Sequence, residues 1–192
     1  MIQRTTDKAE RILKTAEQLF RADGFHATGV DQIAARSGVT KRTLYKHFGS
    51  KEGLIEAVLR RNHDQTMEHI RSRVAEVEAD GGKQLLVCFD LYQDWFSEPG
   101  FTGCIFIKTL NEFQQCSETL FALAAQAKSD LRAYITEIAR GAGVIDPERL
   151  AYQLHLILEG SIVVAQCGRT VESICTAREL AEKIVSEALV CD

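Results

Sequence analysis

A short segment after Gly38 is rich in basic side chains. Thr40 is a favourable N-cap for a helix over residues 41–48, which places Lys41 and Arg42 in its first turn. Residues at the start of a helix can reach base edges in the major groove, and the free N–H groups there can bind phosphate. A guanine contact from Lys41 or Arg42 would contribute about 1–3 kcal/mol of discrimination between bases.

Two further helices are expected to position this segment. Apolar residues at helical spacing predict a helix over residues 7–22 and a short one over residues 30–37, which buries Ile33. Gly38 then turns the chain, and Leu44 is the residue of the next helix that is expected to face the core. Helix, glycine turn and basic helix together predict a helix-turn-helix.

The segment 28–54 matches a known pattern densely and without a gap. The matching residues are Thr28, Val30, Ile33, Ala34, Gly38, Val39, Thr43, Leu44, Tyr45, His47, Phe48, Ser50, Lys51, Glu52 and Leu54. With these residues the segment closely resembles the DNA-binding domain of the TetR/AcrR family of transcriptional repressors. Beyond the fourth helix, the chain agrees with that family only in length and in its all-helical pattern.

The resemblance implies a set of DNA contacts. Lys41, Arg42 and Thr43 occupy positions that usually face bases. The positions that usually touch phosphate are held by Thr28, Thr40, Tyr45, His47 and Lys51. Two alternatives stay open, since Tyr45 could cover its own helix and His47 could cap the helix end.

The charge distribution agrees with a DNA-binding N-terminal region. Residues 1–51 carry ten Lys/Arg against five Asp/Glu, a net charge of +5. Residues 52–192 carry thirteen against twenty-two, a net charge of −9. A basic region on an acidic remainder favours a polyanionic partner for the basic region.

The whole chain of 192 residues is expected to be all-α, with about nine helices. It holds only two prolines and shows no alternating strand pattern. We expect a helix-turn-helix domain over residues 1–50 and a larger ligand-binding and dimerisation domain over residues 51–192. The fourth helix is predicted over 51–79, a helix beginning near 102 is predicted to end at 113, and the last is predicted over 172–190.

The last two helices are candidates for a dimer interface, because small residues such as Gly160 and Ala177 lie among aliphatic ones. The resemblance implies a homodimer through these helices, bound to an inverted-repeat operator in double-stranded DNA. It also implies that an unidentified small molecule binds the C-terminal domain and releases the protein from DNA. Control by a partner protein or by oxidation remains an alternative, as does an activator or a non-repressing architectural protein.

Candidate effector contacts are less well defined. Aromatic residues and one polar pair are expected at the pocket, although residues at such spacing are often simply core. The candidates are Trp95, Phe96, Cys104, Phe113, Phe121, His155 and Glu159. His155 and Glu159 lie four apart in an apolar helix and could also satisfy each other. Cys104 follows Gly103 at a helix start, which suggests an alternative function as a thiol sensor of electrophiles or oxidants.

Other classes of function are disfavoured by the sequence. It contains no nucleophile-elbow, phosphate-loop or zinc-protease motif, so we expect neither an enzyme nor a cofactor. Its six cysteines form no C-x-x-C pair, and no metal site is expected. The N-terminus has no apolar signal region and no stretch is long enough to span a membrane, which predicts a cytoplasmic protein.

Overall fold

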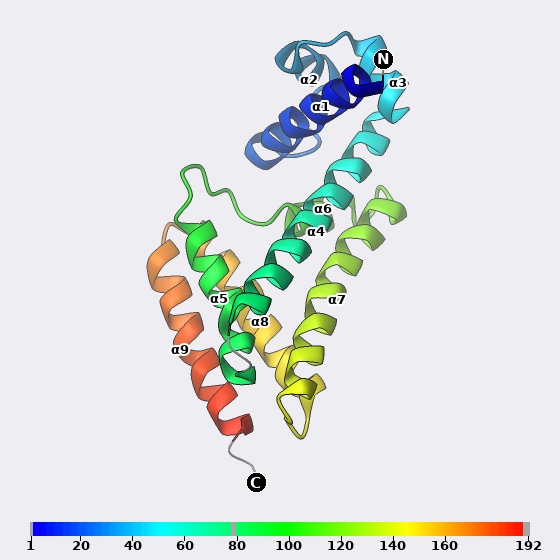
Figure 1. Ribbon diagram of the computed structural model, residues 1–192. Coiled ribbons are helices and arrows are strands. Elements are labelled where there is room, and N and C mark those ends of the chain that lie inside the picture. Colours follow the sequence, from blue (N-terminus) through cyan, green and yellow to red (C-terminus); the bar gives the residue numbers. More distant parts are fainter. Residues whose placement is uncertain (1, 78–79, 190–192) are drawn as a thin grey trace. The chain divides into compact units, whose positions relative to one another are not determined.

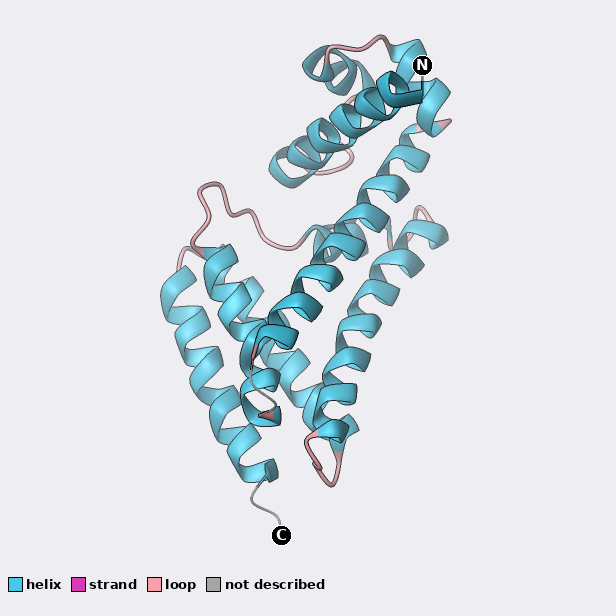
Figure 2. Cartoon of the chain, in the orientation of Figure 1, coloured by secondary structure: helices cyan, strands magenta, loops and turns pink. Residues whose placement is uncertain are grey.

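The computed structural model describes residues 2–77 and 80–189, and within these ranges the chain forms nine α-helices and no strand (Figure 1, Figure 2). The all-α prediction is therefore confirmed. The helices are α1 Ile2–Asp23, α2 Val30–Ser37, α3 Lys41–Phe48, α4 Lys51–Glu76, α5 Gly81–Phe96, α6 Ile105–Phe113, α7 Glu118–Gly141, α8 Pro147–Gln166 and α9 Thr170–Leu189.

Most helix boundaries lie close to the expected ones, and three differ. Helix α1 begins five residues earlier than predicted, because no Gly or Pro interrupts residues 2–6. Helix α6 begins at Ile105, with Cys104 as its N-cap. Helix α9 begins two residues earlier, at Thr170. The predicted ends at residues 79 and 190 lie outside the described residues.

The helices divide into two compact units, and the division differs from the expected boundary at residue 50. The first unit contains residues 1–64 and 104–127, and the second contains residues 65–103 and 128–192. Helix α6 and the first part of α7 thus pack with the N-terminal helices. The reason is a shared aromatic core, in which the Phe113 ring of α6 lies 5.4 Å from the Phe25 ring.

The first unit holds the helix-turn-helix. Its core includes the fully buried residues Phe20, Ile33 and Leu44, one from each of α1, α2 and α3. Gly38 ends α2 with a left-handed φ of 65°, and its N–H donates to the carbonyls of Ala34 and Ala35. A side chain there would be strained, so the glycine is what allows α3 to follow α2 so closely.

The second unit is built around α9, which packs against both α5 and α8. Leu154, Leu158 and Ile162 of α8 are fully buried, and Ala177 and Ala181 of α9 leave room for close helix approach. Helix α8 begins with Pro147 in its first turn and with the Asp146 carboxylate accepting from Arg149 N at 3.1 Å.

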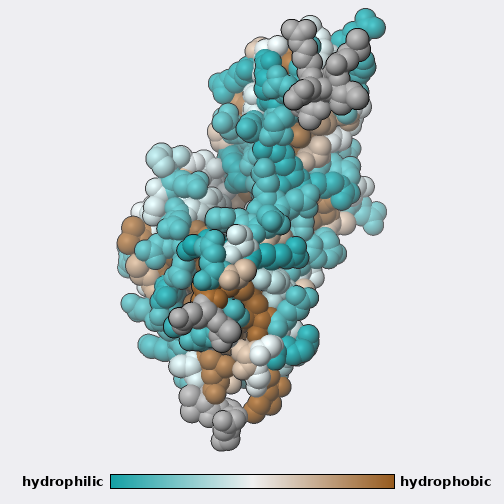
Figure 3. Space-filling view, viewed as in Figure 1, coloured by the Kyte–Doolittle hydropathy of each residue, from teal (hydrophilic) through white to brown (hydrophobic). Residues whose placement is uncertain are grey.

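Hydrophobic and hydrophilic surface are unevenly distributed over the chain (Figure 3). On the face shown, hydrophilic residues dominate along α1 and α4, and brown hydrophobic atoms gather over helices of the second unit. No helix within the described residues is long and apolar enough to cross a membrane.

Candidate nucleic-acid interface

The local sequence of α3 folds it with one buried and one exposed face. Thr40 has extended backbone, and its hydroxyl accepts from Thr43 N at 3.2 Å, the expected N-cap bond. Leu44 is fully buried, whereas Lys41, Arg42 and Lys46 are exposed. The helix therefore presents its basic side chains away from the core.

The two cations in the first turn of α3 have different surroundings. Lys41 Nζ lies 3.0 Å from Asp31 Oδ1 and 3.1 Å from Oδ2, and this contact raises the pKa of Lys41. Arg42 is exposed and has no charged or hydrogen-bonded partner among residues 2–77 and 80–189. Arg42 is thus the cation of this turn whose donors are all available to a ligand.

Of the five expected phosphate contacts, four lie at or near the surface. Tyr45 is 40 % exposed, Thr40 is exposed, and His47 is half-buried beside Phe48. Lys51 is half-buried in the first turn of α4, and its ammonium lies 3.5 Å from the His26 carbonyl oxygen.

Thr28 does not fit its expected place. Its side chain is fully buried, and its hydroxyl donates to the Gly24 carbonyl at 2.7 Å. The hydroxyl closes the loop between α1 and α2, so it cannot also reach a phosphate in this conformation. Thr28 is better explained as a structural residue of the loop.

Residues of α6 that the sequence did not single out hold the same loop in place. The Glu112 carboxylate accepts from Phe25 N at 3.0 and 3.1 Å and from His26 N at 2.9 Å. The Lys108 ammonium donates to the Arg21 carbonyl at the end of α1. Gly24 has a φ of 85°, and a Cβ there would lie 2.9 Å from Glu112 Oε1. These contacts join segments about 87 residues apart, which no local sequence pattern reveals.

The seven predicted effector residues are divided between the two units. Trp95 and Phe96 belong to an aromatic group of the second unit that also contains Tyr92 and Phe101, with ring centroids 4.8–6.0 Å apart. Cys104, Phe113 and Phe121 belong to the first unit. His155 and Glu159 lie on α8 in the second unit.

The polar pair on α8 is joined by a third residue, Lys128 of α7. Lys128 Nζ donates to Glu159 Oε1 at 2.7 Å, and His155 Nε2 lies 3.4 Å from the same oxygen. His155 is buried, and its Nε2 makes no aligned hydrogen bond. Burial raises the pKa of Glu159, but His155 and Lys128 lower it by more, so the pKa lies below its ordinary value. The sequence predicted the pair but not the lysine.

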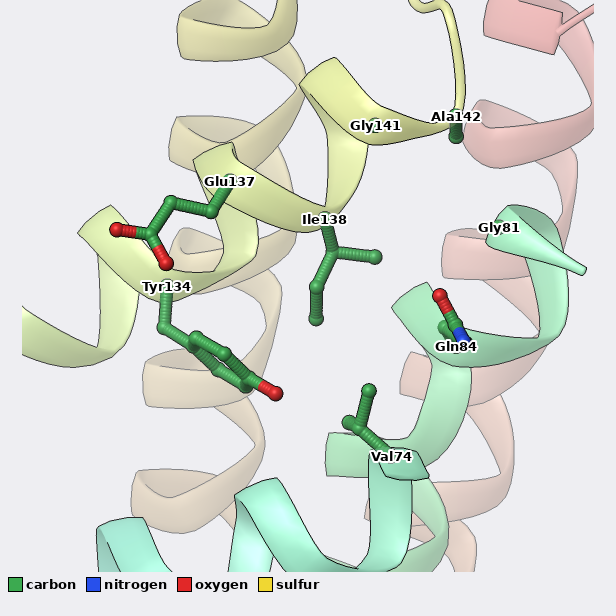
Figure 4. Close-up of a pocket in the computed structure, with 8 residues that line it drawn as sticks. All are labelled: Val74, Gly81, Gln84, Tyr134, Glu137, Ile138, Gly141 and Ala142. Atoms are coloured by element: carbon green, nitrogen blue, oxygen red, sulfur yellow. The ribbon is translucent and has the colours of Figure 1, made fainter. Parts of the chain in front are cut away.

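A separate pocket of about 410 Å³ opens in the second unit (Figure 4). Val74, Gln84 and Ile138 point into it from α4, α5 and α7. Tyr134 lies beside them with its hydroxyl towards the space, and Arg71 lies 5.6 Å from the centre of its ring. The remaining lining residues are Gly81, Glu137, Gly141 and Ala142. None of the seven predicted effector residues lines this pocket.

The geometry defines a class of protein. A three-helix unit with an exposed basic helix after a glycine turn, followed only by helices in the described chain, is a helix-turn-helix DNA-binding protein. Residues 12–58 match the family model described as bacterial regulatory proteins, tetR family. The N-terminal segment thus matches the DNA-binding domain of this family, and relatives such as YjdC are named HTH-type transcriptional regulators.

Relatives extend the similarity over most of the chain. The HTH-type transcriptional activator FasR of Mycolicibacterium smegmatis is 27 % identical over 166 residues, which cover 78 % of this chain and 73 % of FasR. The HTH-type transcriptional regulator YjdC of Escherichia coli is 24 % identical over 92 % of each chain.

Solved structures share the fold. A TetR-family regulator from Streptomyces coelicolor superposes with a TM-score of 0.86 at 24 % identity, covering 96 % of this chain and 97 % of that one. The reduced form of NemR from Escherichia coli gives a TM-score of 0.85 at 22 % identity, covering 92 % and 96 %. Within the described residues no group of His, Cys, Asp and Glu could hold a metal ion.

Proposed function

We propose that this protein is a homodimeric, ligand-responsive repressor that binds an inverted-repeat operator and leaves it when a small molecule binds its second unit. The observation that carries the DNA-binding part is the exposed first turn of α3, where Arg42 has no partner in the described chain. Arg42, Lys41 and Thr43 are the proposed base-reading residues. Thr40, Tyr45, His47 and Lys51 are the proposed phosphate contacts.

The test of this part is a footprint on DNA from the promoter region next to the gene, repeated across a salt series. We expect a protected inverted repeat and an affinity that falls steeply with salt, because phosphate contacts release counterions. A reporter gene behind the same DNA distinguishes repression from activation, which is needed because the relative FasR is named an activator. Protection of a single half-site would contradict the dimeric mode.

The dimer is proposed to form through α8 and α9, because both helices expose large apolar side chains. Tyr152, Leu156 and Val163 are 52–63 % exposed on α8, at spacings that place them on one face. Gly160 lies within that face, and a Cβ there would meet nothing within 4 Å. On α9, Val171 and Leu180 are 67 % and 45 % exposed. Apolar residues in such number on two adjacent helices favour a partner surface of the same kind.

The effector is proposed to bind in the pocket between α4, α5 and α7. Val74, Ile138 and Ala142 supply apolar lining, and the Tyr134 hydroxyl, the Gln84 amide and the Glu137 carboxylate supply polar groups that could orient a ligand. Gly141 lines the pocket, and a Cβ there would meet nothing within 4 Å. Gly141→Leu should therefore fill the space without disturbing the fold.

A compound screen on the protein–DNA complex provides the measurement. Compounds that release wild-type protein should fail to release Gly141→Leu, whereas Gly141→Ala should respond as wild type does. Equal release of all three proteins would place the effector elsewhere. The buried cluster of Lys128, His155 and Glu159 would then be the next polar anchor to test.

Thiol sensing through Cys104 is the second candidate, and burial disfavours it. Cys104 is 8 % exposed, whereas Cys116, Cys167 and Cys175 are exposed thiols. A sensor thiol has to meet its oxidant or electrophile in solution. Release of DNA by peroxide that Cys104→Ser abolishes would favour this candidate over the pocket.

The DNA partner also implies that the protein acts in the bacterial cytoplasm.

A further inference from the structure

An ion pair joins the two helices of the helix-turn-helix at their N-termini. Asp31 lies in the first turn of α2 and Lys41 in the first turn of α3. Both carboxylate oxygens lie within 3.1 Å of Lys41 Nζ. Both side chains are exposed, 80 % for Asp31 and 51 % for Lys41. The pair therefore lies on the same surface turn that is proposed to meet DNA.

The negative charge of Asp31 is unusual within the basic segment of residues 30–51. Between residues 30 and 51 it is the only acidic residue, among the basic residues Arg36, Lys41, Arg42, Lys46 and Lys51. A carboxylate that lies beside a phosphate backbone repels it. Asp31 also occupies the ammonium of Lys41, which leaves Arg42 as the unpaired cation of the turn.

We propose that Asp31 is a specificity-determining residue, which restrains Lys41 and so suppresses binding to DNA of the wrong sequence. The proposal rests on the proposed DNA interface. Non-specific binding consists almost entirely of phosphate contacts, and a Lys41 ammonium held by Asp31 is withheld from them. In the major groove, base acceptors such as guanine O6 and N7 can replace the Asp31 carboxylate as the partner of Lys41. They can do so only where the DNA sequence places such a base opposite Lys41. The restraint thus weakens non-specific binding more than specific binding.

A purely structural role for Asp31 has a different consequence. An acidic residue in the first turn of a helix also stabilises that helix through its dipole. That effect does not involve Lys41, so it would lower the melting temperature of Asp31→Asn equally in the presence and absence of Lys41. The proposed restraint disappears when Lys41 is replaced.

The experiment compares wild type, Asp31→Asn, Lys41→Gln and the double variant on two probes. One is a duplex of scrambled sequence, and the other carries a site selected by the wild-type protein from random DNA. On the scrambled duplex we expect Asp31→Asn to bind about two- to five-fold more tightly, the range that an exposed ion pair is worth. Its plot of log affinity against log salt should be steeper by about 0.9, as for one more phosphate contact. The ratio of specific to non-specific affinity should fall.

Controls separate the proposal from net charge and from the function itself. Glu148→Gln removes one exposed negative charge from α8 and should leave both affinities unchanged. In the Lys41→Gln background only the direct repulsion by Asp31 remains, so Asp31→Asn should steepen the salt dependence clearly less than it does in the wild-type background. An unchanged non-specific affinity and slope for Asp31→Asn, with wild type binding both probes, would overturn this inference alone. Wild-type protein that binds neither probe would overturn the proposed function and this inference with it.

Discussion

At the scale of single residues, the most informative contrast is between neighbours in the first turn of α3. Lys41 is paired with Asp31 and Arg42 has no partner in the described chain, although the sequence presents them as equals. The guanidinium also offers two parallel donors, which suit the O6 and N7 acceptors of guanine. Arg42 should therefore carry more base discrimination than Lys41.

Arg42→Ala should cost about 1–3 kcal/mol of operator binding and relax the preference at one base pair in each half-site. Competition titrations with single-base variants of the operator would measure both effects. Lys46→Ala, at an exposed position of the same helix, serves as the control and should weaken binding to all variants alike. A uniform loss for Arg42→Ala would assign it to phosphate instead.

A second prediction at this scale concerns acid stability. The folded protein holds the pKa of Glu159 below its ordinary value, so the ionised carboxylate is favoured by folding. Its contribution is present above the unfolded pKa and is lost as the pH falls through the folded pKa. Melting temperatures measured from neutral to acidic pH should therefore fall less steeply for Glu159→Gln than for wild type. Glu148→Gln, at an exposed position, should follow wild type.

At the scale of elements, local chemistry was enough to predict the helices but not their partners. The N-cap Thr40 and the turn at Gly38 depend on neighbouring residues, and both are found as expected. The attachment of α6 to the loop between α1 and α2 depends on contacts across about 87 residues. Helical periodicity describes one helix at a time, so Glu112 looked like any polar residue. For the same reason, periodicity alone does not reveal that α6 packs with the N-terminal helices.

The contact between α6 and this loop gives a prediction at the element scale. Glu112→Ala removes the acceptor of two backbone N–H groups and should cost about 1–3 kcal/mol of stability. DNA affinity should fall with it, because the loop leads into α2. Glu112→Gln keeps one acceptor oxygen and should be intermediate. Urea unfolding is the measurement, with Asn111→Ala, exposed on the same helix, as the control. A free energy of unfolding equal to that of wild type in Glu112→Ala would show that the loop between α1 and α2 keeps its conformation without α6.

At the scale of the whole molecule, charge and oligomeric state act together. The net charge of −9 on residues 52–192 opposes the polyanion that the +5 of residues 1–51 attracts. A dimer brings two basic regions to one operator, so the number of phosphate contacts doubles. The DNA must then also carry two half-sites at the correct spacing. Specific binding should consequently depend on dimerisation far more than non-specific binding does.

Leu156→Glu tests this dependence. A carboxylate within the exposed apolar face of α8 would have to be buried in a dimer, so the variant should sediment as a monomer. Operator affinity should then fall by about 10³-fold or more, towards the non-specific level, with an unchanged circular dichroism spectrum. Ile145→Glu changes a 76 % exposed residue outside α8 and α9 and should remain dimeric. A dimeric Leu156→Glu would move the interface to other helices.

The packing of α6 against the N-terminal helices also limits how such regulators can be recombined. A chimera joined at residue 50 would transfer α1, α2 and α3 without Glu112 and Phe113. Phe25 would then lose the carboxylate that accepts from its N–H and the ring that packs against its own. The host's own α6 would have to fit a foreign loop. Exchange of operator specificity between relatives should therefore succeed by substituting the exposed residues of α3, or by moving residues 104–127 together with the first 64.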